Sequence, residues 1–187
     1  GSPCPRRPLA RPRGALKETP PDDPQGNPLS EERYIREARL ADRAFISRLS
    51  GRAFRRFGSY AGVIRDWLDS GEALTLVALS GGRPVGFAMA ARIPPPLTAP
   101  GETEVLALAV APEVRRSGIG RRLLRDIEAA ALAAGVGVIR LHTATDNDPA
   151  RALFEVEGFR VLDLKRRFYP HGQDAHLMIK ETPIGET

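Results

Sequence analysis

Five arginines crowd one short stretch of this chain, around two glycines at the expected start of a helix. The stretch runs from Val110 to Glu128, and its arginines are Arg115, Arg116, Arg121, Arg122 and Arg125. The first turn of a helix carries unpaired N–H groups and a partial positive charge, so it normally favours acidic side chains. Basic side chains at this end of a helix have two explanations: the arginines are solvated, or an anion binds among them.

The two glycines, Gly118 and Gly120, let a ligand approach the peptide N–H groups. They allow a sharp turn from the apolar stretch 105–111 onto a helix whose first N–H groups point together, an arrangement that binds phosphate. This is not a dinucleotide fingerprint, because Leu123 replaces the third glycine, and there is no Gly-Lys-Ser/Thr of a triphosphate loop. A short Arg-Gly pattern also occurs by chance, so the solvated alternative stays open.

Three further side chains have the chemistry to move protons. Glu104 and His142 lie on expected strands, and Tyr169 lies in an expected hairpin loop. A carboxylate or an imidazole can act as a general base, and a phenol as a general acid. Each also has a plain structural explanation, since a strand glutamate can face solvent, a lone histidine is often structural and a buried tyrosine needs no chemical role.

Hydrophobic periodicity and turn residues predict the elements that position these groups. Strands are expected over 34–38, 73–79, 84–91, 102–110, 136–143, 159–165 and 175–180. Helices are expected over 42–50, 59–70, from the arginine-rich turn to about 135, and over 149–157. Asp42 and Ser59 are the expected N-caps of the first two helices. This order predicts an α/β (α+β) fold with a mixed sheet flanked by helices.

Composition limits the classes of protein that remain. The chain has 187 residues, 42% of them hydrophobic, which suits one globular domain. Apolar runs such as 105–111 are too short to span a membrane, so a soluble protein without a membrane partner is expected. A single cysteine, Cys4, leaves no internal disulfide and too few thiols for a zinc cluster, which favours the cytoplasm and no metal. The net charge of +5 permits phosphate-bearing ligands or nucleic acid without choosing between them.

Residues 1–29 differ from the rest of the chain. They contain eight of the 17 prolines, alternating with charged residues, and no periodic apolar face. Such a segment cannot offset the entropy of ordering by burial. It is expected to be a flexible, Pro-rich basic tail, followed by one domain over residues 30–187.

Two motifs, in the same order and with a strand between them, resemble those of the GNAT N-acetyltransferase superfamily. The turn reads VAPEVRRSGIGRRLL and resembles that family's acetyl-CoA-binding motif, and the second motif reads NDPARALFEVEGF. The C-terminal RRFYPHGQDAHLM resembles the branch of ribosomal-protein alanine N-acetyltransferases. The resemblance implies a mostly antiparallel central sheet whose two middle strands splay into a V.

The resemblance also implies where acetyl-CoA binds. Backbone N–H groups of the turn hold the pyrophosphate, which by position are those of Arg116, Ser117, Gly118, Ile119, Gly120 and Arg121. The end of the preceding strand, Leu108, Ala109 and Val110, pairs with the pantetheine arm, and the N–H of Leu108 polarises the thioester carbonyl. Asn147 stands where the family has a CoA-contacting Asn, although it can equally be a helix cap.

For catalysis, the resemblance points to Glu104 as the general base. Glu104 lies 14 residues before Gly118, the spacing seen in histone-type acetyltransferases. Strand alternation is expected to place it on the same face as Leu106 and Leu108, among apolar neighbours. The alanine N-acetyltransferases have a Glu where this chain has His142, which is the alternative base.

A second departure from the alanine N-acetyltransferases concerns the general acid. They have a tyrosine where this chain has Phe154, and a phenylalanine cannot protonate the leaving thiolate. Tyr169 is the nearest alternative hydroxyl in sequence terms. The missing tyrosine leaves open whether the chain acts on the ribosomal-protein substrate. Acetyl transfer in general is still expected, because binding and orientation supply much of the rate.

The expected function is acetyl-CoA-dependent acetylation of a primary amine, on a protein N-terminus, a lysine or a small molecule. A catalytically weak, CoA-binding regulatory domain is the alternative, suggested by the missing tyrosine. Nucleic-acid binding is a third class, but the arginines cluster at a Gly-rich turn and not along a face with interleaved aromatics. A monomer or a homodimer is expected.

Overall fold

A computed structural model of the protein describes residues 32–58, 60–93 and 101–183. The expected tail over residues 1–29, the expected Ser59 cap and residues 94–100 lie outside the described residues. The elements follow one another as β1 (Arg33–Glu37), α1 (Arg43–Ala53), α2 (Tyr60–Ser70), β2 (Leu74–Ser80), β3 (Arg83–Ile93), β4 (Gly101–Val110), α3 (Ile119–Ala133), β5 (Val136–Ala144), α4 (Asp148–Val156), β6 (Arg160–Lys165) and β7 (Ala175–Glu181). Short 3-10 turns are η1 (Leu40–Asp42), η2 (Arg55–Phe57) and η3 (Pro112–Val114).

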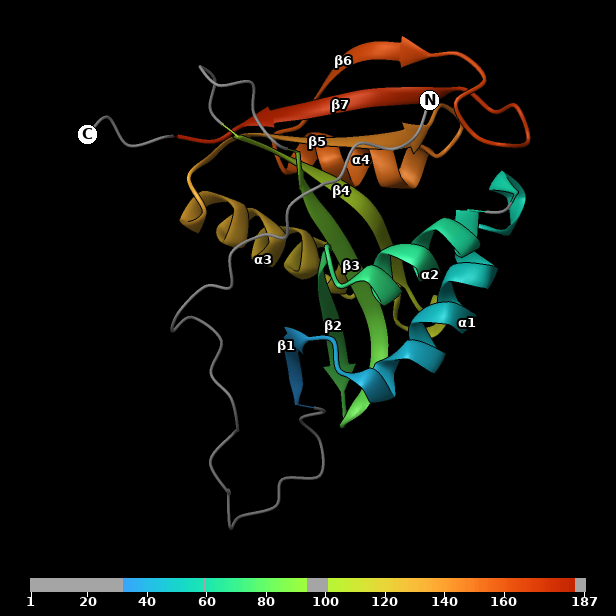
Figure 1. Ribbon diagram of the computed structural model, residues 1–187, viewed down its shortest axis with the longest axis vertical. Coiled ribbons are helices and arrows are strands. Elements are labelled where there is room, and N and C mark those ends of the chain that lie inside the picture. Colours follow the sequence, from blue (N-terminus) through green and yellow to red (C-terminus); the bar gives the residue numbers. More distant parts are fainter. Residues whose placement is uncertain (1–31, 59, 94–100, 184–187) are drawn as a thin grey trace.

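The strands form one seven-stranded mixed sheet in the order β1-β2-β3-β4-β5-β7-β6. Neighbouring strands are antiparallel except β4 and β5, which are parallel because α3 connects them. The sheet and its flanking helices confirm the expected fold class (Figure 1).

Helices cover both faces of the sheet and bury two separate apolar cores. On one face, Leu123 and Ile127 of α3 pack in a cluster that includes Leu76 of β2. On the other, Ile46 of α1 packs in a cluster that includes Val77, the next residue of β2. Consecutive residues of a strand point to opposite faces, so both faces of β2 are covered, as its near-continuous burial shows. In Figure 1, α1 and α2 lie side by side, away from α3.

One expected helix cap is wrong. Asp42 occupies the N-cap position of α1, but its side chain makes no capping hydrogen bond. Its carboxylate instead accepts hydrogen bonds from the guanidinium of Arg36, at 2.6 Å, and from the backbone N–H of Arg39, at 2.7 Å. Asp42 thereby ties β1 to the start of α1, and the 3-10 turn η1 precedes the helix in place of a sharp cap.

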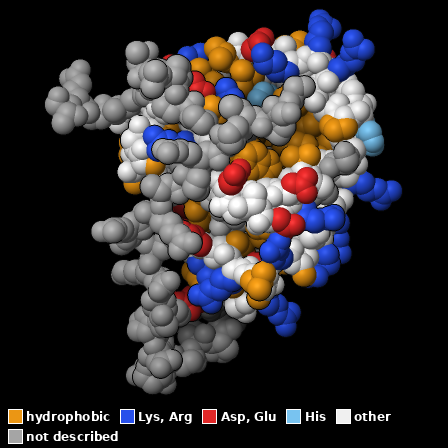
Figure 2. Space-filling view, viewed as in Figure 1, with side chains coloured by type: hydrophobic (Ala, Val, Ile, Leu, Met, Phe, Trp, Pro, Cys, Tyr) orange, Lys and Arg blue, Asp and Glu red, His pale blue; other side chains and the backbone are white. Residues whose placement is uncertain are grey.

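Figure 2 shows how hydrophobic and charged side chains are distributed on one face of the molecule. Hydrophobic side chains gather in the upper half of this view, while Lys and Arg side chains are spread around the rim. No described helix is long and apolar enough to cross a membrane. Within the described ranges there is also no group of three or more His, Cys, Asp and Glu side chains placed to hold a metal ion.

Candidate active site

The middle strands β4 and β5 separate and open a cleft, which confirms the expected splay. Their parallel ladder runs from the pair Gly101–Val136 to the pair Val105–Leu141. Beyond it, β4 stays paired with β3 as far as Val110, and β5 stays paired with β7. The two strand edges border a cavity of about 70 Å³ that residues near η2, α2 and α4 also line.

A β-bulge lies where the separation begins. Consecutive residues of β3, Met89 and Ala90, pair with Ala107 and Val105 of β4, so Leu106 is an extra residue. A bulge bends its strand and increases the local twist. The position of this bulge, one residue after the last β4–β5 pair, accounts for the change of direction that opens the cleft.

The bulge also overturns an expectation about side-chain faces. Leu106 packs against the core on the α1–α2 side, whereas Leu108 packs against the core under α3. Glu104, Leu106 and Leu108 therefore do not share one face, because the extra residue interrupts the alternation. The hydroxyl of Tyr60 donates a hydrogen bond of 2.8 Å to the Leu106 carbonyl and holds the bulge in place.

The turn before α3 presents N–H groups that have no acceptor within the helix. The backbone is left-handed at Arg116, with φ 61°, and at Gly118, with φ 83°. Arg122 donates the first hydrogen bond of the helix, to the Gly118 carbonyl at 3.0 Å, which leaves the N–H groups before it for another partner. A Cβ added to Gly118 would meet no atom within 4 Å. The turn therefore fits an anion such as a pyrophosphate.

Two arginines of α3 have a structural partner that the sequence did not reveal. Glu157, at the end of α4 and only 8% exposed, lies 2.6 Å from Nε of Arg121 and 2.8 Å from Nε of Arg125. Arg122 lies 3.7 Å from Asp126, one turn along the helix. Much of the reversed charge pattern is thus explained by carboxylates of the chain itself. No local pattern distinguishes Glu157, because its partners lie far along the sequence.

The turn nevertheless keeps a positive environment. It borders a cavity of about 310 Å³ whose lining includes Ser117, Gly118 and the side chains of Arg33, Arg121, Arg122 and Arg125. Arg115 and Arg116 are exposed beside it. These cations outnumber the nearby carboxylates of Glu157 and Asp126, so anion binding at the turn stays a prediction.

Replacing Glu157 with Gln should lower the free energy of unfolding by about 1–2 kcal/mol, because neutral hydrogen bonds replace charged ones. Hydrogen bonding from Arg125 holds the pKa of Glu157 below its ordinary value of 4.5. The stabilisation by Glu157 is therefore complete when the pH is above this ordinary pKa. It is lost as the pH falls through the lower pKa of the folded state. Urea unfolding at about pH 7 and about pH 3 should show a difference that shrinks in acid. An equal effect from Glu155→Gln, whose side chain is 53% exposed, would contradict this.

Glu104 and His142, singled out separately in the sequence, form one hydrogen-bonded pair. Oε1 of Glu104 lies 3.2 Å from Nδ1 of His142, and the two side chains are 12% and 13% exposed. Nη2 of Arg140 lies 3.6 Å from the other carboxylate oxygen. Glu104 pairs with Arg140 in the ladder one position before its end, so the group stands at the apex of the cleft.

The side chains that contact the Glu104 carboxylate are thus basic, whereas the sequence predicted apolar neighbours. Arg140 reaches both Glu104 and Glu102, which lies 3.2 Å from its Nη1. Sequence reasoning missed Arg140, although it lies two residues before His142 on one strand and therefore shares a face with it. Only the register of β4 against β5 places the carboxylate between these two side chains.

Tyr169 lies in an aromatic cluster at the cleft. Its ring is 7% exposed, stacks on Phe57 at 4.3 Å and meets Tyr60 edge-on at 5.9 Å. Burial raises the pKa of Tyr169 far above its ordinary value, so the hydroxyl keeps its proton at neutral pH. Tyr169 and Phe154 both line the cleft. Tyr169 therefore shares a cavity with Phe154, the position at which the alanine N-acetyltransferases have a tyrosine.

Asn147 also lies at the cleft. It occupies the N-cap position of α4, but its side chain makes no capping hydrogen bond. The alternative explanation of this residue as a helix cap is therefore wrong for the side chain. Asn147 lines the same cavity as His142 and Tyr169, which leaves its amide available to a ligand.

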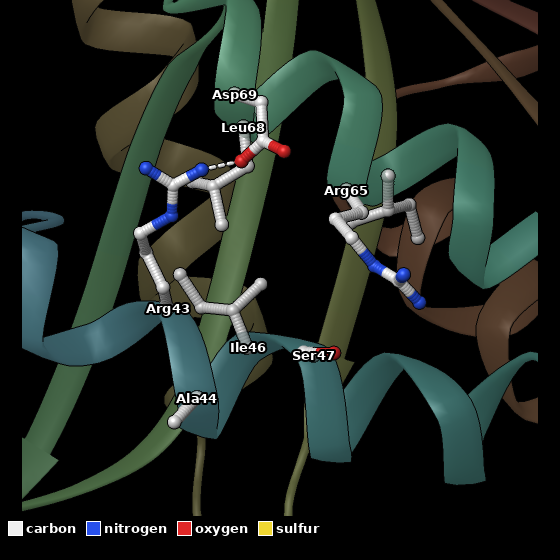
Figure 3. Close-up of a pocket in the computed structure, with 8 residues that line it drawn as sticks. Arg43, Ala44, Ile46, Ser47, Arg65, Leu68 and Asp69 are labelled. Atoms are coloured by element: carbon white, nitrogen blue, oxygen red, sulfur yellow. Dashed lines mark ion pairs between the residues drawn. The ribbon is translucent and has the colours of Figure 1, made fainter.

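A separate pocket lies between α1 and α2 and has no link to this chemistry. It measures about 280 Å³ and shares no lining residue with the cleft. In Figure 3, Ile46 and Leu68 point into it, and an ion pair between Arg43 and Asp69 crosses one side. The one carboxylate in its described lining, Asp69, is paired with Arg43, and that lining contains no histidine, cysteine or tyrosine, so the candidate active site remains the cleft.

Comparison with known proteins agrees with this architecture. The family model described as acetyltransferase (GNAT) family matches residues 39–159, more than half of the chain. The N-alpha-acetyltransferase of Sulfurisphaera tokodaii is 31% identical over 158 residues, which cover 79% of this chain and 92% of that protein. The chain belongs to the GNAT acetyltransferase family.

Other relatives of this GNAT chain are more similar over shorter stretches. The N-alpha-acetyltransferase RimI of Mycobacterium tuberculosis is 42% identical over 106 residues, covering 56% of this chain but only 64% of that protein. Among solved structures, the ribosomal-protein-S18-alanine N-acetyltransferase of Escherichia coli superposes with a TM-score of 0.63 at 24% identity. The two superposed regions cover 83% of this chain and 96% of the other. At that identity the superposition establishes the fold.

The GNAT match ends before the last two strands. It includes β4, the turn, β5 and α4, but not the connection between β6 and β7. GNAT proteins use acetyl-CoA as the acetyl donor, and the turn and cleft described above are the parts of this chain that fit it. The family model does not reach Tyr169 and its neighbours on the β6–β7 connection, whose resemblance rests on the motif RRFYPHGQDAHLM.

Proposed function

We propose that this GNAT protein transfers the acetyl group of acetyl-CoA to the α-amine at the N-terminus of a protein. The observation that carries the proposal is the cleft between β4 and β5, with Glu104 and His142 paired at its apex. The names of the Sulfurisphaera tokodaii and Mycobacterium tuberculosis relatives favour an α-amine over a lysine or a small amine.

Acetyl-CoA binds with its pyrophosphate on the turn. The N–H groups of Arg116, Ser117, Gly118, Ile119, Gly120 and Arg121 surround the anion, and the helix dipole favours it. The pantetheine arm runs along Leu108, Ala109 and Val110, whose edge has no β5 partner. Asn147 contacts the arm from the start of α4.

The chain's own groups prepare the amine and the thioester. An α-amine has a reference pKa of about 7.7–8.0, so part of it is protonated near neutral pH and must lose a proton before it attacks. Glu104 accepts that proton, directly or through the imidazole of His142. The N–H of Leu108 stabilises the oxyanion that forms when the amine attacks the carbonyl. The new N–C bond then replaces the C–S bond and Tyr169 gives a proton to the departing thiolate. The second proton that the nitrogen loses returns to Tyr169 through solvent.

An acceptor panel tests the function. Thiol release from acetyl-CoA is measured with a peptide that has a free N-terminus, with the same peptide acetylated at its N-terminus but carrying a free lysine, and with a polyamine. The first should be the fastest by at least about tenfold. Equal rates on all three would contradict α-amine selectivity. Binding of acetyl-CoA without any turnover would instead support the regulatory alternative.

Replacing Tyr169 with Phe should lower kcat about tenfold, as expected for loss of a general acid, and leave the Kd of acetyl-CoA unchanged. Phe57→Leu is the control for packing, because the Phe57 ring stacks on Tyr169 and carries no hydroxyl. Steady-state kinetics and calorimetry measure both effects. If the two variants lose the same amount of kcat, Tyr169 acts through packing and is not the acid.

A further inference from the structure

One aromatic contact at the active site has no role in the chemistry described so far. The ring of Phe168 stacks face to face on the imidazole of His142, with centroids 4.2 Å apart and planes 14° from parallel. Phe168 lies on the connection between β6 and β7, which the family match does not reach. A large apolar side chain that is 38% exposed at such a place needs a reason.

The connection holds Phe168 firmly in this position. The next residue, Tyr169, is buried and stacks on Phe57 of η2. The backbone N–H of Arg167 donates to Oδ1 of Asp174 at 2.7 Å and closes the loop from the other side. Phe168 itself packs edge-on against Tyr169 at 5.0 Å. Its ring is thus fixed from both flanking residues and offers the imidazole a rigid surface.

The imidazole needs such a surface. Its single hydrogen bond to Glu104, at 3.2 Å, fixes Nδ1 but permits rotation about the side-chain bonds, because the last torsion of a histidine has a broad minimum. A stacked ring removes that freedom, since tilting the imidazole breaks the parallel contact. Among the described residues that line the cleft, His142 is present and Phe168 is absent. Phe168 therefore contacts the imidazole without lining the cleft itself.

We propose that Phe168 is a positioning residue that holds the His142 imidazole with Nδ1 toward Glu104 and Nε2 toward the acceptor. Both carboxylate oxygens of Glu104 are engaged, one by His142 and one by Arg140. The acceptor proton passes to Nε2 while Nδ1 gives its own proton to the carboxylate, so that Glu104 is the final base. After the acetyl group is transferred, Glu104 returns this proton to Nδ1 and Nε2 releases its proton to solvent.

This inference rests on the proposed function, and two variants test it. Phe168→Leu removes the ring but keeps an apolar side chain, and Phe168→Tyr keeps the ring. We expect kcat to fall about tenfold in the first and to stay within about twofold in the second, with KM for the peptide and Kd for acetyl-CoA unchanged in both. Leu164→Ala, an exposed position on the same hairpin, is the control for general disturbance and should behave like wild type.

Nitrogen NMR of the imidazole gives a readout that does not need turnover. In the wild type and in Phe168→Tyr, the ring nitrogens of His142 should show one dominant tautomer with the proton on Nδ1. In Phe168→Leu they should show a mixture. Unchanged kcat and an unchanged tautomer in Phe168→Leu would overturn the positioning role. Absence of acetyl transfer in the wild type would contradict the proposed function instead, and the tautomer measurement would still decide the role of Phe168.

Discussion

Replacing Glu104 with Gln is expected to lower kcat on a peptide acceptor by about 10²–10⁴-fold near neutral pH, the range that general-base catalysis contributes. Glutamine keeps the size of the side chain and removes its basicity. The loss should shrink as the pH rises, because more of the acceptor amine is then already neutral. Calorimetry should show an unchanged affinity for acetyl-CoA, since Glu104 stands at the apex of the cleft and the pyrophosphate turn follows the other end of β4.

His142→Gln is the matched test of the pair. Because Glu104 and His142 share a hydrogen bond, the ionisation on the acidic limb of the pH–rate profile belongs to both residues. If they act as a unit, the double variant is no slower than the slower single variant. If His142→Gln removes that ionisation while Glu104→Gln keeps it, His142 alone is the base and the assignment of Glu104 is wrong.

The second large effect is expected at the turn. Gly118→Asp should weaken acetyl-CoA binding about 100-fold, or about 2.8 kcal/mol, because it sets a negative charge against the pyrophosphate. The fold should survive, since a side chain at this position meets no atom within 4 Å and aspartate tolerates a left-handed φ better than most residues. Gly120 is a second site for this test, because a Cβ there makes only ordinary contacts with Leu153 and Val110 at 3.6 Å.

Gly118→Asn is the control for that variant. It has nearly the shape of aspartate and the same tolerance of the left-handed region, but no charge. Titration calorimetry on the two proteins therefore isolates the electrostatic part of the effect. Equal affinities for the Asp and Asn variants would mean that no anion binds at this turn.

Local sequence patterns were sufficient to predict the elements of the fold. The hairpin around Gly81 and Gly82 was expected over 73–79 and 84–91, and the strands run over Leu74–Ser80 and Arg83–Ile93. The first helix was expected to end at Ser50 and ends at Ala53. These features depend on side-chain periodicity and on turn residues with positive φ, which act over a few neighbouring positions. They can therefore be read from the chain without its partners.

The candidate site was predicted in part. Residue type, spacing and the family resemblance singled out Glu104, His142, Asn147 and Tyr169, and in the structure the last three line the cleft while Glu104 bonds to one of them. The prediction that Leu108 shares a face with Glu104 was wrong, because the bulge between them depends on the pairing of β3 with β4. The strand pattern of β4 gives no sign of the extra residue.

The sequence by itself determined the order of strands and helices, the Gly-rich turn and the residue types available for proton transfer. The tertiary structure decided which of those residues meet: Glu104 with His142, 38 positions apart, and Glu157 with Arg125, 32 positions apart. The physical reason is that the two kinds of interaction act over different distances along the chain. Propensities and caps act between near neighbours, whereas these contacts depend on strand register and helix packing, which are fixed only when the whole core is buried.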